Sequence, residues 1–157
     1  MLETRVIPVL SFKDNGSGII KTHKFNKQTY LGDILNAVKI FNEKEVDELV
    51  ILDIYASKQN REPNFERIKR IATECFMPLA YGGGIKTLSH IKKAFAQGIE
   101  KIIICSAGDD FELIKSASKI YGNQSIVVCI DLKKNFLGKF QILKESGTKI
   151  IKLSIED

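Results

Sequence analysis

Two aspartates of this chain occupy positions where a charged side chain is unusual and where catalytic residues are often found. Asp53 and Asp131 each come directly after a long apolar run. A charged group at such a position is costly to bury unless it is paired or takes part in a reaction. Asp131 is therefore a candidate general acid or base, provided that partial burial raises its pKa towards neutral pH. The alternative for both residues is a structural carboxylate that caps a helix or forms a salt bridge.

A run of three glycines is the second candidate site. Gly82, Gly83 and Gly84 stand between an apolar run and a segment with helical periodicity. Glycines let the backbone approach an anion, and the start of a following helix presents free N–H groups to it. The pattern is neither a Walker loop nor the dinucleotide fingerprint. We predict a phosphate site here, to which Ser106 adds a hydroxyl from the end of the next apolar run; the alternative is a tight turn.

These candidates would lie together if the apolar runs are parallel strands, because sites in such folds gather at the carboxyl ends of the strands. Short β-rich runs do alternate with helix-period segments, which predicts crossover connections and a parallel sheet. Helices are expected to begin near Asn64, Thr87, and Asp109 or Asp110. Residues 16–26 are expected to be a loop, and residues 139–143 and 149–153 a hairpin. The expected strands are residues 5–12, 48–54, 78–81, 101–105 and 125–132.

Composition narrows the class of protein. The 157 residues are 44% hydrophobic and 27% charged, as in an ordinary globular domain. No apolar run approaches the roughly 20 residues of a membrane span, and the start of the chain lacks a signal-peptide pattern. We therefore expect a cytoplasmic protein without membrane contact. The net charge of +5 comes from lysines scattered among acidic residues, which disfavours nucleic acid and suits a phosphorylated small substrate.

The cysteines and histidines do not indicate a metal site or a disulfide framework. Cys75, Cys105 and Cys129 are far apart in the sequence and lie in apolar surroundings. We expect buried, reduced thiols. His23 and His90 are isolated, and no Cys/His spacing is typical of zinc, so no metal and no cofactor is expected.

Four stretches of the chain resemble the cyclase subunit of imidazole glycerol phosphate synthase, and the similarity extends over essentially the whole length. They are residues 5–10, 47–57, 79–85 and 127–131. The resemblance favours a barrel over an open doubly wound sheet. It implies an α/β fold that is a partial (β/α)8 TIM barrel, with about five parallel strands plus a short hairpin. Because such barrels have about 250 residues, residues 1–157 would be a single N-terminal portion of the domain.

The resemblance also implies an activity in histidine biosynthesis. The family is a lyase subunit that receives ammonia from a glutaminase partner and cyclises a ribulosyl aminoimidazole substrate with two phosphates. Asp131 matches one of its two catalytic aspartates, and Gly84 and Ser106 match one phosphate site. Lys21 matches a lysine on a mobile substrate loop after the first strand.

Further residues match the end of the family barrel that faces the glutaminase. Arg5, Glu48 and Lys101 match three of the four charged residues of the ammonia gate. Glu100 stands where the family has an acidic residue that faces the glutaminase.

Two departures from the family pattern favour impaired activity. Ser11 replaces the other catalytic aspartate, and a short internal similarity between residues 10–15 and 130–135 aligns Ser11 with Asp131. The sequence also ends after the hairpin that follows the fifth strand, so strands six to eight are expected to be missing. One alternative is a related branch of the family, a glutaminase partner that serves the amidation of surface-polysaccharide sugars. The others are a non-catalytic half-barrel interaction protein and an incomplete reading frame.

Overall fold

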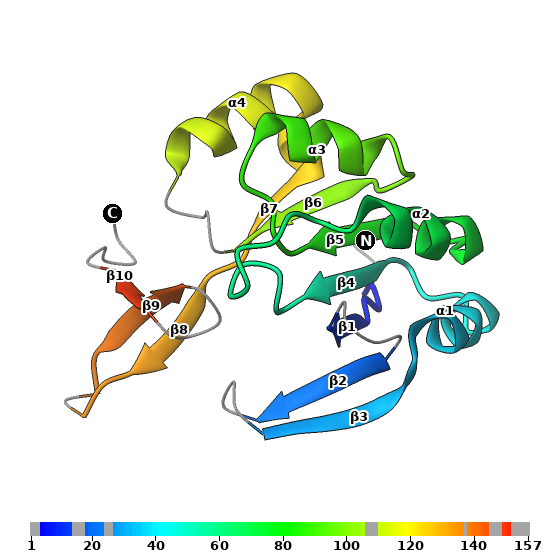
Figure 1. Ribbon diagram of the computed structural model, residues 1–157, viewed down its shortest axis with the longest axis horizontal. Helices are drawn as coiled ribbons and strands as arrows, with labels where there is room; N and C mark the ends of the chain where they lie inside the picture. The colour runs from blue at the N-terminus through cyan, green and yellow to red at the C-terminus, as the bar shows by residue number, and fades with distance from the viewer. Residues whose placement is uncertain are drawn as a thin grey trace.

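A seven-stranded sheet forms the centre of the fold, in the order β3-β2-β1-β4-β5-β6-β7 (Figure 1). A computed structural model describes residues 4–13, 18–23, 27–105, 110–136, 138–144 and 149–151. Five strands, β1 and β4 to β7, run parallel, and β2 and β3 extend the sheet as an antiparallel hairpin. The strands are β1 Val9–Phe12, β2 Gly18–His23, β3 Lys27–Asp33, β4 Leu49–Asp53, β5 Leu79–Gly82, β6 Lys101–Ile104 and β7 Ile126–Val128.

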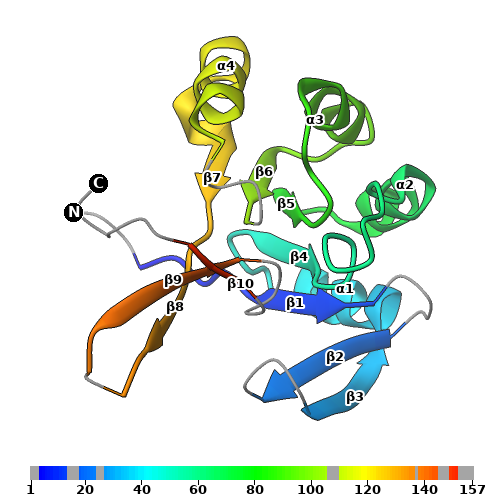
Figure 2. The same ribbon diagram turned by 60° about the vertical axis from the view of Figure 1, so that its left-hand side comes forward.

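Four α-helices lie along one face of this sheet, and Figure 2 shows them following one another around it. They are α1 Ile34–Glu43, α2 Phe65–Glu74, α3 Leu88–Phe95 and α4 Phe111–Tyr121, with a short 3-10 helix, η1 Asn123–Ser125, before β7. α2, α3 and α4 each connect two neighbouring parallel strands. The fold is therefore α/β with a mostly parallel sheet, as the alternation of strands and helices predicts. Among the described residues β7 pairs only with β6 in this sheet, so the sheet is open, which is consistent with part of a barrel.

Capping side chains fix where the helices begin. Asn64, Thr87 and Asp110 each accept a hydrogen bond from a backbone N–H of the first helical turn, and Asp33 accepts two at the start of α1. These bonds satisfy N–H groups that have no partner within a helix. The starts expected at the first two of these residues and at Asp110 are confirmed; Asp109 lies outside the described residues.

The two faces of the parallel sheet carry different clusters. The helix side buries a large apolar core, to which β4 contributes Leu49 and Ile51. The opposite side, here called the inner face, has a small cluster of Val50, Ala80 and Ile103. Successive residues of a strand point to opposite faces, so the alternation of β4 residues between the two clusters follows directly.

A separate three-stranded antiparallel sheet follows β7 and lies apart from the four helices (Figure 1). It contains β8 Asp131–Lys134, β9 Phe140–Lys144 and β10 Lys149–Ile151. The pairing of β9 with β10 confirms the expected hairpin. The expected fifth strand over residues 125–132 is wrong at its end, because β7 stops at Val128. Asp131 belongs instead to β8 and pairs with Leu143.

The loop expected over residues 16–26 is also wrong in part. Residues 18–23 form β2, which pairs antiparallel with β3. Gly18 allows this pairing, since a Cβ at Gly18 would lie 2.2 Å from a ring carbon of Tyr30. Lys21 therefore lies on a strand of a hairpin. The ends expected for the first four parallel strands are confirmed to within one residue. No helix of the described part of the chain is long and apolar enough to cross a membrane.

Candidate functional site

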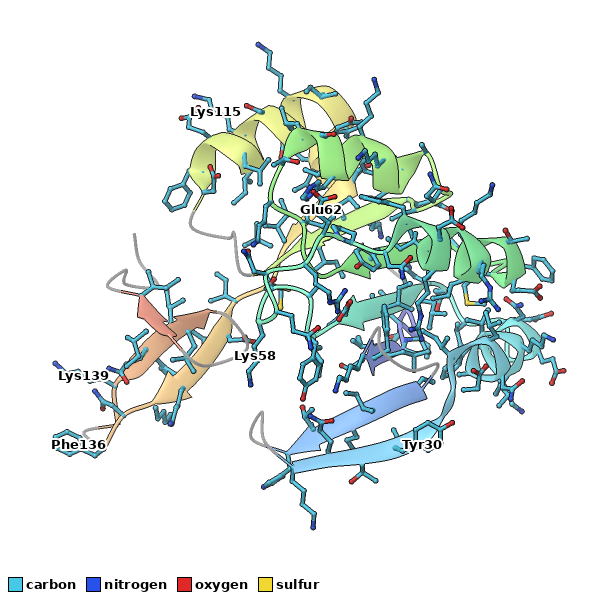
Figure 3. All side chains as sticks on the ribbon, in the orientation of Figure 1. Tyr30, Lys58, Glu62, Lys115, Phe136 and Lys139 are labelled. Carbon is cyan, nitrogen blue, oxygen red and sulfur yellow. The ribbon has the colours of Figure 1, made fainter. Side chains whose placement is uncertain are left out.

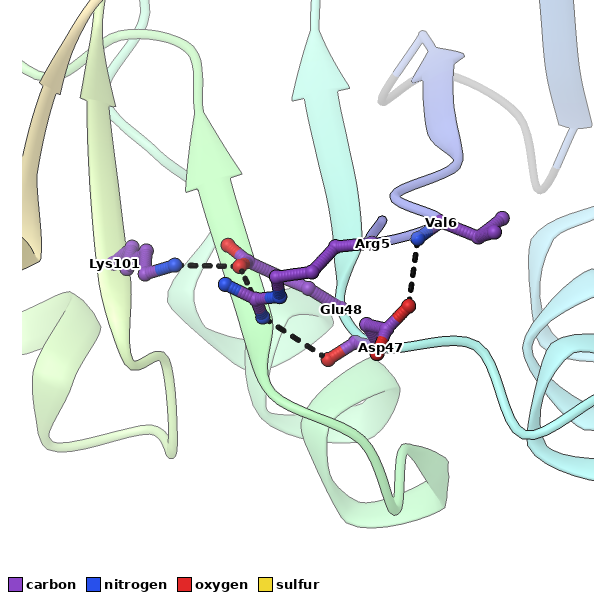
Figure 4. Close-up of polar contacts among 5 residues, drawn as sticks. All are labelled: Arg5, Val6, Asp47, Glu48 and Lys101. Carbon is purple, nitrogen blue, oxygen red and sulfur yellow. Dashed lines mark hydrogen bonds and ion pairs between the residues drawn. The ribbon is translucent and has the colours of Figure 1, made fainter. Parts of the chain in front are cut away.

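Three charged side chains meet at the amino ends of the parallel strands (Figure 4). The Glu48 carboxylate lies 3.3 Å from Arg5 Nη2 and 2.5 Å from Lys101 Nζ. The Glu48 side chain is only 5% exposed, whereas Arg5 and Lys101 are 50% and 28% exposed. A buried carboxylate is stable when it is paired and hydrogen-bonded in this way. We call these three residues the ion cluster.

The starts of the parallel strands bring the three residues of the ion cluster together. Glu48 directly precedes β4, and Lys101 is the first residue of β6, so its side chain reaches Glu48 across the start of β5. Arg5 precedes β1, where the Asp47 side chain accepts a hydrogen bond from the Val6 N–H at 2.6 Å. By alternation from Val50 and Ile103, Glu48 and Lys101 belong to the inner face. The structure thus brings together the three residues expected at an ammonia gate; that role stays a prediction.

Glu100 lies beside the ion cluster in sequence but not in the cluster. Its side chain is exposed, and its backbone N–H donates to the Leu79 carbonyl oxygen at 2.9 Å. An exposed carboxylate at the amino end of β6 is available to a partner that covers this end of the sheet.

At the opposite, carboxyl ends of the strands the candidate acid–base residues are half-buried. Ser11 is paired in register with Leu52 on β4 and belongs to the inner face. Asp131 opens β8, and burial raises its pKa above the ordinary value. This direction is the one that a general acid or base requires. Within the described residues no hydrogen bond joins Ser11 to Asp131; Ser11 lies on β1 and Asp131 comes three residues after the end of β7, and these are the two outer strands of the five-stranded parallel part of the sheet.

The glycine run has a packing role that the sequence did not indicate. Gly83 and Gly84 have φ values of 129° and 70°, which L side chains rarely adopt. A Cβ on Gly83 would lie 2.5 Å from the Asp53 carbonyl oxygen, and one on Gly84 would lie 2.8 Å from the Arg61 carbonyl oxygen. The glycines therefore let the segment after β4 pack directly on them. Phosphate binding by these glycines stays a prediction, and Ser106 lies outside the described residues.

Asp53 holds that same segment. Its side chain is 1% exposed and accepts hydrogen bonds from the N–H groups of Tyr55 at 3.0 Å and Ala56 at 3.1 Å. Arg61 Nη2 donates to the other carboxylate oxygen at 3.0 Å. Of the two interpretations open for Asp53, the structural salt-bridging carboxylate is the one that the geometry supports.

Lysines near the carboxyl end of β4 could receive an anion. The ammonium groups of Lys13 and Lys58 lie 5.0 and 5.9 Å from the centre of the Tyr55 ring. Figure 3 shows Lys58 at the end of the sheet that adjoins β8. Sequence reasoning missed Tyr55 and Lys58, because only the contact across the β4 segment brings them to Lys13. Lys21 is exposed on β2. In the part of the chain that the structure describes, no three His, Cys, Asp or Glu residues form a group that could hold a metal ion.

Comparisons with known proteins show the family of the chain. Residues 5–156 match the family described as "Histidine biosynthesis protein". The "Putative imidazole glycerol phosphate synthase subunit hisF2" of Pseudomonas aeruginosa is 50% identical over 98% of this chain and 61% of its own length. A "Putative imidazole glycerol phosphate synthase subunit HisF" of Leptospira interrogans is 47% identical over 100% of this chain and 62% of its own length. The "Imidazole glycerol phosphate synthase subunit HisF" of Methanococcus vannielii is 40% identical over 96% of this chain and 55% of its own length.

The chain thus spans about three fifths of the length of these curated relatives. The match nevertheless covers nearly all of the chain, including the ion cluster, the glycine run and Asp131. The chain belongs to the histidine biosynthesis protein family and is similar throughout to the HisF subunits of imidazole glycerol phosphate synthase.

Proposed function

We propose that this chain is the N-terminal portion of a (β/α)8-barrel synthase subunit that uses ammonia supplied by a glutaminase. The observation that carries the proposal is the ion cluster at the amino ends of parallel strands, within a chain whose relatives are subunits of imidazole glycerol phosphate synthase. In this proposal the two ends of the parallel strands have different functions. Ammonia enters at the amino end, and a phosphorylated substrate binds at the carboxyl end.

The ion cluster suits an ammonia entrance for an electrostatic reason. Glu48 is paired with both Arg5 and Lys101, so one negative and two positive charges leave a net charge of about +1, which disfavours the entry of ammonium and other cations but not of neutral ammonia. Lys101 is a long, partly exposed side chain that can turn to solvent while Arg5 still pairs with Glu48, so the buried carboxylate is not left alone. Such a movement would open a path along the inner face towards Ser11 and Asp131.

Docking of a glutaminase can be tested directly on the full chain. We expect a purified glutaminase subunit from the same genome to bind, with heat measured by titration calorimetry. Glu100→Lys reverses an exposed charge at the docking end and should weaken binding by about tenfold or more, since like charges across an interface cost several kcal/mol. Glu112→Lys, an exposed charge on α4, is the matched control and should leave binding unchanged. Equal weakening by the two variants, or no binding of the unaltered chain, would contradict the docking face.

The carboxyl end of the sheet is altered in its acid–base chemistry. A half-buried Asp131 can exchange a proton near its raised pKa, whereas the Ser11 hydroxyl is neither an acid nor a base of suitable pKa near neutrality. Each positioned acid–base group contributes about 100- to 10,000-fold to a rate. We therefore propose that the activity in the histidine-pathway cyclisation is impaired by Ser11.

A hybrid protein tests this point. Residues 1–157 are joined to the remaining segment of the P. aeruginosa relative and assayed with ammonium and the diphosphorylated aminoimidazole substrate. We expect turnover only for Ser11→Asp, at about 100-fold or more above the hybrid with Ser11. Equal turnover of both hybrids would show that this position has no acid–base role.

A second candidate function follows from the same residue. If Ser11 removes the cyclisation chemistry and the ion cluster remains, the subunit still delivers ammonia to another acceptor. The activated carboxyl group of a surface-polysaccharide sugar is such an acceptor. Growth without histidine, in a strain whose own cyclase subunit is deleted, tests the first function, and rescue by the Ser11 hybrid supports the histidine pathway. Rescue by Ser11→Asp alone excludes that pathway for the Ser11 form, and amidation of the sugar carboxyl group by the Ser11 hybrid with its glutaminase would then support the second function.

A further inference from the structure

Two cysteines that are far apart in the sequence stand side by side at the carboxyl ends of β6 and β7. The register of these parallel strands pairs Ile104 with Val128, the residues directly before Cys105 and Cys129. The Cys129 N–H donates to the Ile104 carbonyl oxygen at 2.9 Å, so the two strands are still hydrogen-bonded at the step directly before the cysteines. Cys105 and Cys129 are therefore opposite each other on neighbouring strands.

Their side chains also share a face. Both pack against the inner-face cluster of Val50, Ala80 and Ile103. Neighbouring strands lie about 4.7–4.9 Å apart, and a disulfide requires Cα atoms about 4.4–6.8 Å apart. Both thiols are free and neither is fully buried, so a small oxidant can reach them. Within the described residues Cys75 lies elsewhere, at the end of α2, and its Sγ donates to the Met77 carbonyl oxygen.

We propose that Cys105 and Cys129 form a modification site, a dithiol that hydrogen peroxide converts to an intrachain disulfide. The Cys129 thiolate attacks one peroxide oxygen, the O–O bond breaks, and hydroxide leaves, so that Cys129 becomes a sulfenic acid. The Cys105 thiol then loses its proton and attacks the Cys129 sulfur, and a second hydroxide leaves. The two thiol protons convert the two hydroxides to water. The two thiols are oxidised by two electrons in total, and one peroxide is reduced.

The order of the two steps follows from the environment of each sulfur. The Cys105 thiol acts as a hydrogen-bond donor to Cys129 and lowers the pKa of Cys129 to about 7, although burial and the charge of Asp131 act in the opposite direction. The same hydrogen bond, with burial, raises the pKa of Cys105. Burial raises the pKa of Cys75. Because the thiolate is the reactive form, Cys129 reacts first and Cys75 reacts slowly.

The site adjoins the candidate acid–base residue without depending on it. Asp131 is two residues after Cys129, and its negative charge acts on both thiols. A disulfide removes the hydrogen bond between the thiols and ties the end of β6 to the segment that leads to Asp131. The proposed disulfide does not depend on the proposed function, because it is argued from the register of β6 and β7 and from the chemistry of thiols.

The test uses the folded full chain and an equimolar amount of hydrogen peroxide. After the remaining thiols are blocked, trypsin digestion is expected to yield one linked pair, residues 102–115 joined to residues 120–133, with the mass of two hydrogen atoms lost. Cys75, on residues 71–86, should remain reduced, with a loss about tenfold slower or more. Cys105→Ser should stop at a sulfenic acid on Cys129 that dimedone traps. Cys75→Ser should leave the linked pair unchanged.

The result from the unaltered chain decides the proposal even if a variant fails to fold. A linkage that includes Cys75, a linkage between two chains, or three thiols that disappear at equal rates would each overturn it. Oxidation in 8 M urea provides the reference for a chain without structure, with about one molar equivalent of oxidant in both cases. Preference for the Cys105–Cys129 pair should be present in the folded chain and lost in urea; the same preference in both would also overturn it.

Discussion

Substitutions at the buried and at the exposed members of the ion cluster should lower the stability of the protein by different amounts. Glu48 is almost fully buried, whereas Arg5 and Lys101 reach solvent. Glu48→Gln removes the buried charge and leaves two cations that can turn to water. Lys101→Met leaves the buried carboxylate with Arg5 alone. The variant that removes the more exposed partner should therefore destabilise the protein more than the variant that removes the buried one.

The magnitudes follow from the exposure of each group. A charge-assisted hydrogen bond contributes about 1.5–3 kcal/mol, and solvent screening of the two cations places Glu48→Gln near 2 kcal/mol. Loss of one partner of a buried ion pair costs about 3–5 kcal/mol; because Arg5 remains, we expect about 3 kcal/mol for Lys101→Met. For a chain of this size these values correspond to decreases in Tm of about 4–8 °C and 6–12 °C.

Urea unfolding followed by circular dichroism measures both effects. The double variant Glu48→Gln/Lys101→Met should be less destabilised than the sum of the single variants, by about 1–2 kcal/mol. Lys115→Met, an exposed lysine on α4, is the control and should change stability by less than about 0.5 kcal/mol. Additive single effects, or a larger loss for Glu48→Gln than for Lys101→Met, would refute the reasoning.

Three further predictions concern the carboxyl end of the sheet. Asp53→Asn keeps an oxygen for the two N–H donors but loses the charged hydrogen bond from Arg61. Urea unfolding should therefore show that the free energy of unfolding falls by about 2 kcal/mol, and a decrease below about 0.5 kcal/mol would contradict the prediction. Gly83→Ala should lower the free energy of unfolding by about 3 kcal/mol more than Gly32→Ala does. The two glycines have similar φ values, but only a Cβ at position 83 would meet Asp53, so equal losses of stability would exclude this contact as the cause. Burial raises the pKa of Asp131, so the folded state is penalised where Asp131 is ionised and is relieved as the pH falls through that raised pKa. Asp131→Asn should therefore raise Tm slightly at pH 7 and not below about pH 3.9, the ordinary pKa of Asp; a decrease at pH 7 would contradict it.

The sequence indicated the parallel strands because each is short and apolar, and because β4, β5 and β6 are each followed by a segment with helical periodicity. The runs at β4 and β6 are apolar at consecutive positions, which is typical of a strand that is buried on both faces. The caps at Asn64 and Thr87 were predictable for a local reason, since each side chain bonds within its own first turn.

The two errors have a different physical origin. β3 is exposed along most of its length and pairs only with β2, so no buried face imposes an alternation on it. β7 and β8 form a nearly continuous β-rich stretch from Ile126 to Lys134, yet the partner changes from β6 to β9 within it. A change of sheet is a tertiary event, and the residues on either side of it are all compatible with a strand.

The candidate site was predictable only where function depends on residue type. Asp131 is recognisable from its residue type and its place after an apolar run, whereas the three residues of the ion cluster were expected from the resemblance to the family. The contact of Gly83 with Asp53 depends on how the segment after β4 folds back, and the thiol pair depends on the register of β6 and β7. Neither contact can be predicted from the spacing of residues in the sequence. Cys105 and Cys129, for example, are separated by a whole helix and a strand.

Strand register connects these separate features into one surface. Alternation along β4 places Glu48, Val50 and Leu52 on the inner face, and the same alternation along β6 places Lys101, Ile103 and Cys105 there. From the amino to the carboxyl end, the inner face therefore changes from paired charges through small apolar residues to groups that can transfer protons or electrons. A register shift of one residue would move all of these side chains to the helix side at once. The side chains that the inner face presents are thus specified by the same apolar alternation that builds the core, and a replacement of Ser11 by another small polar residue would leave that alternation intact.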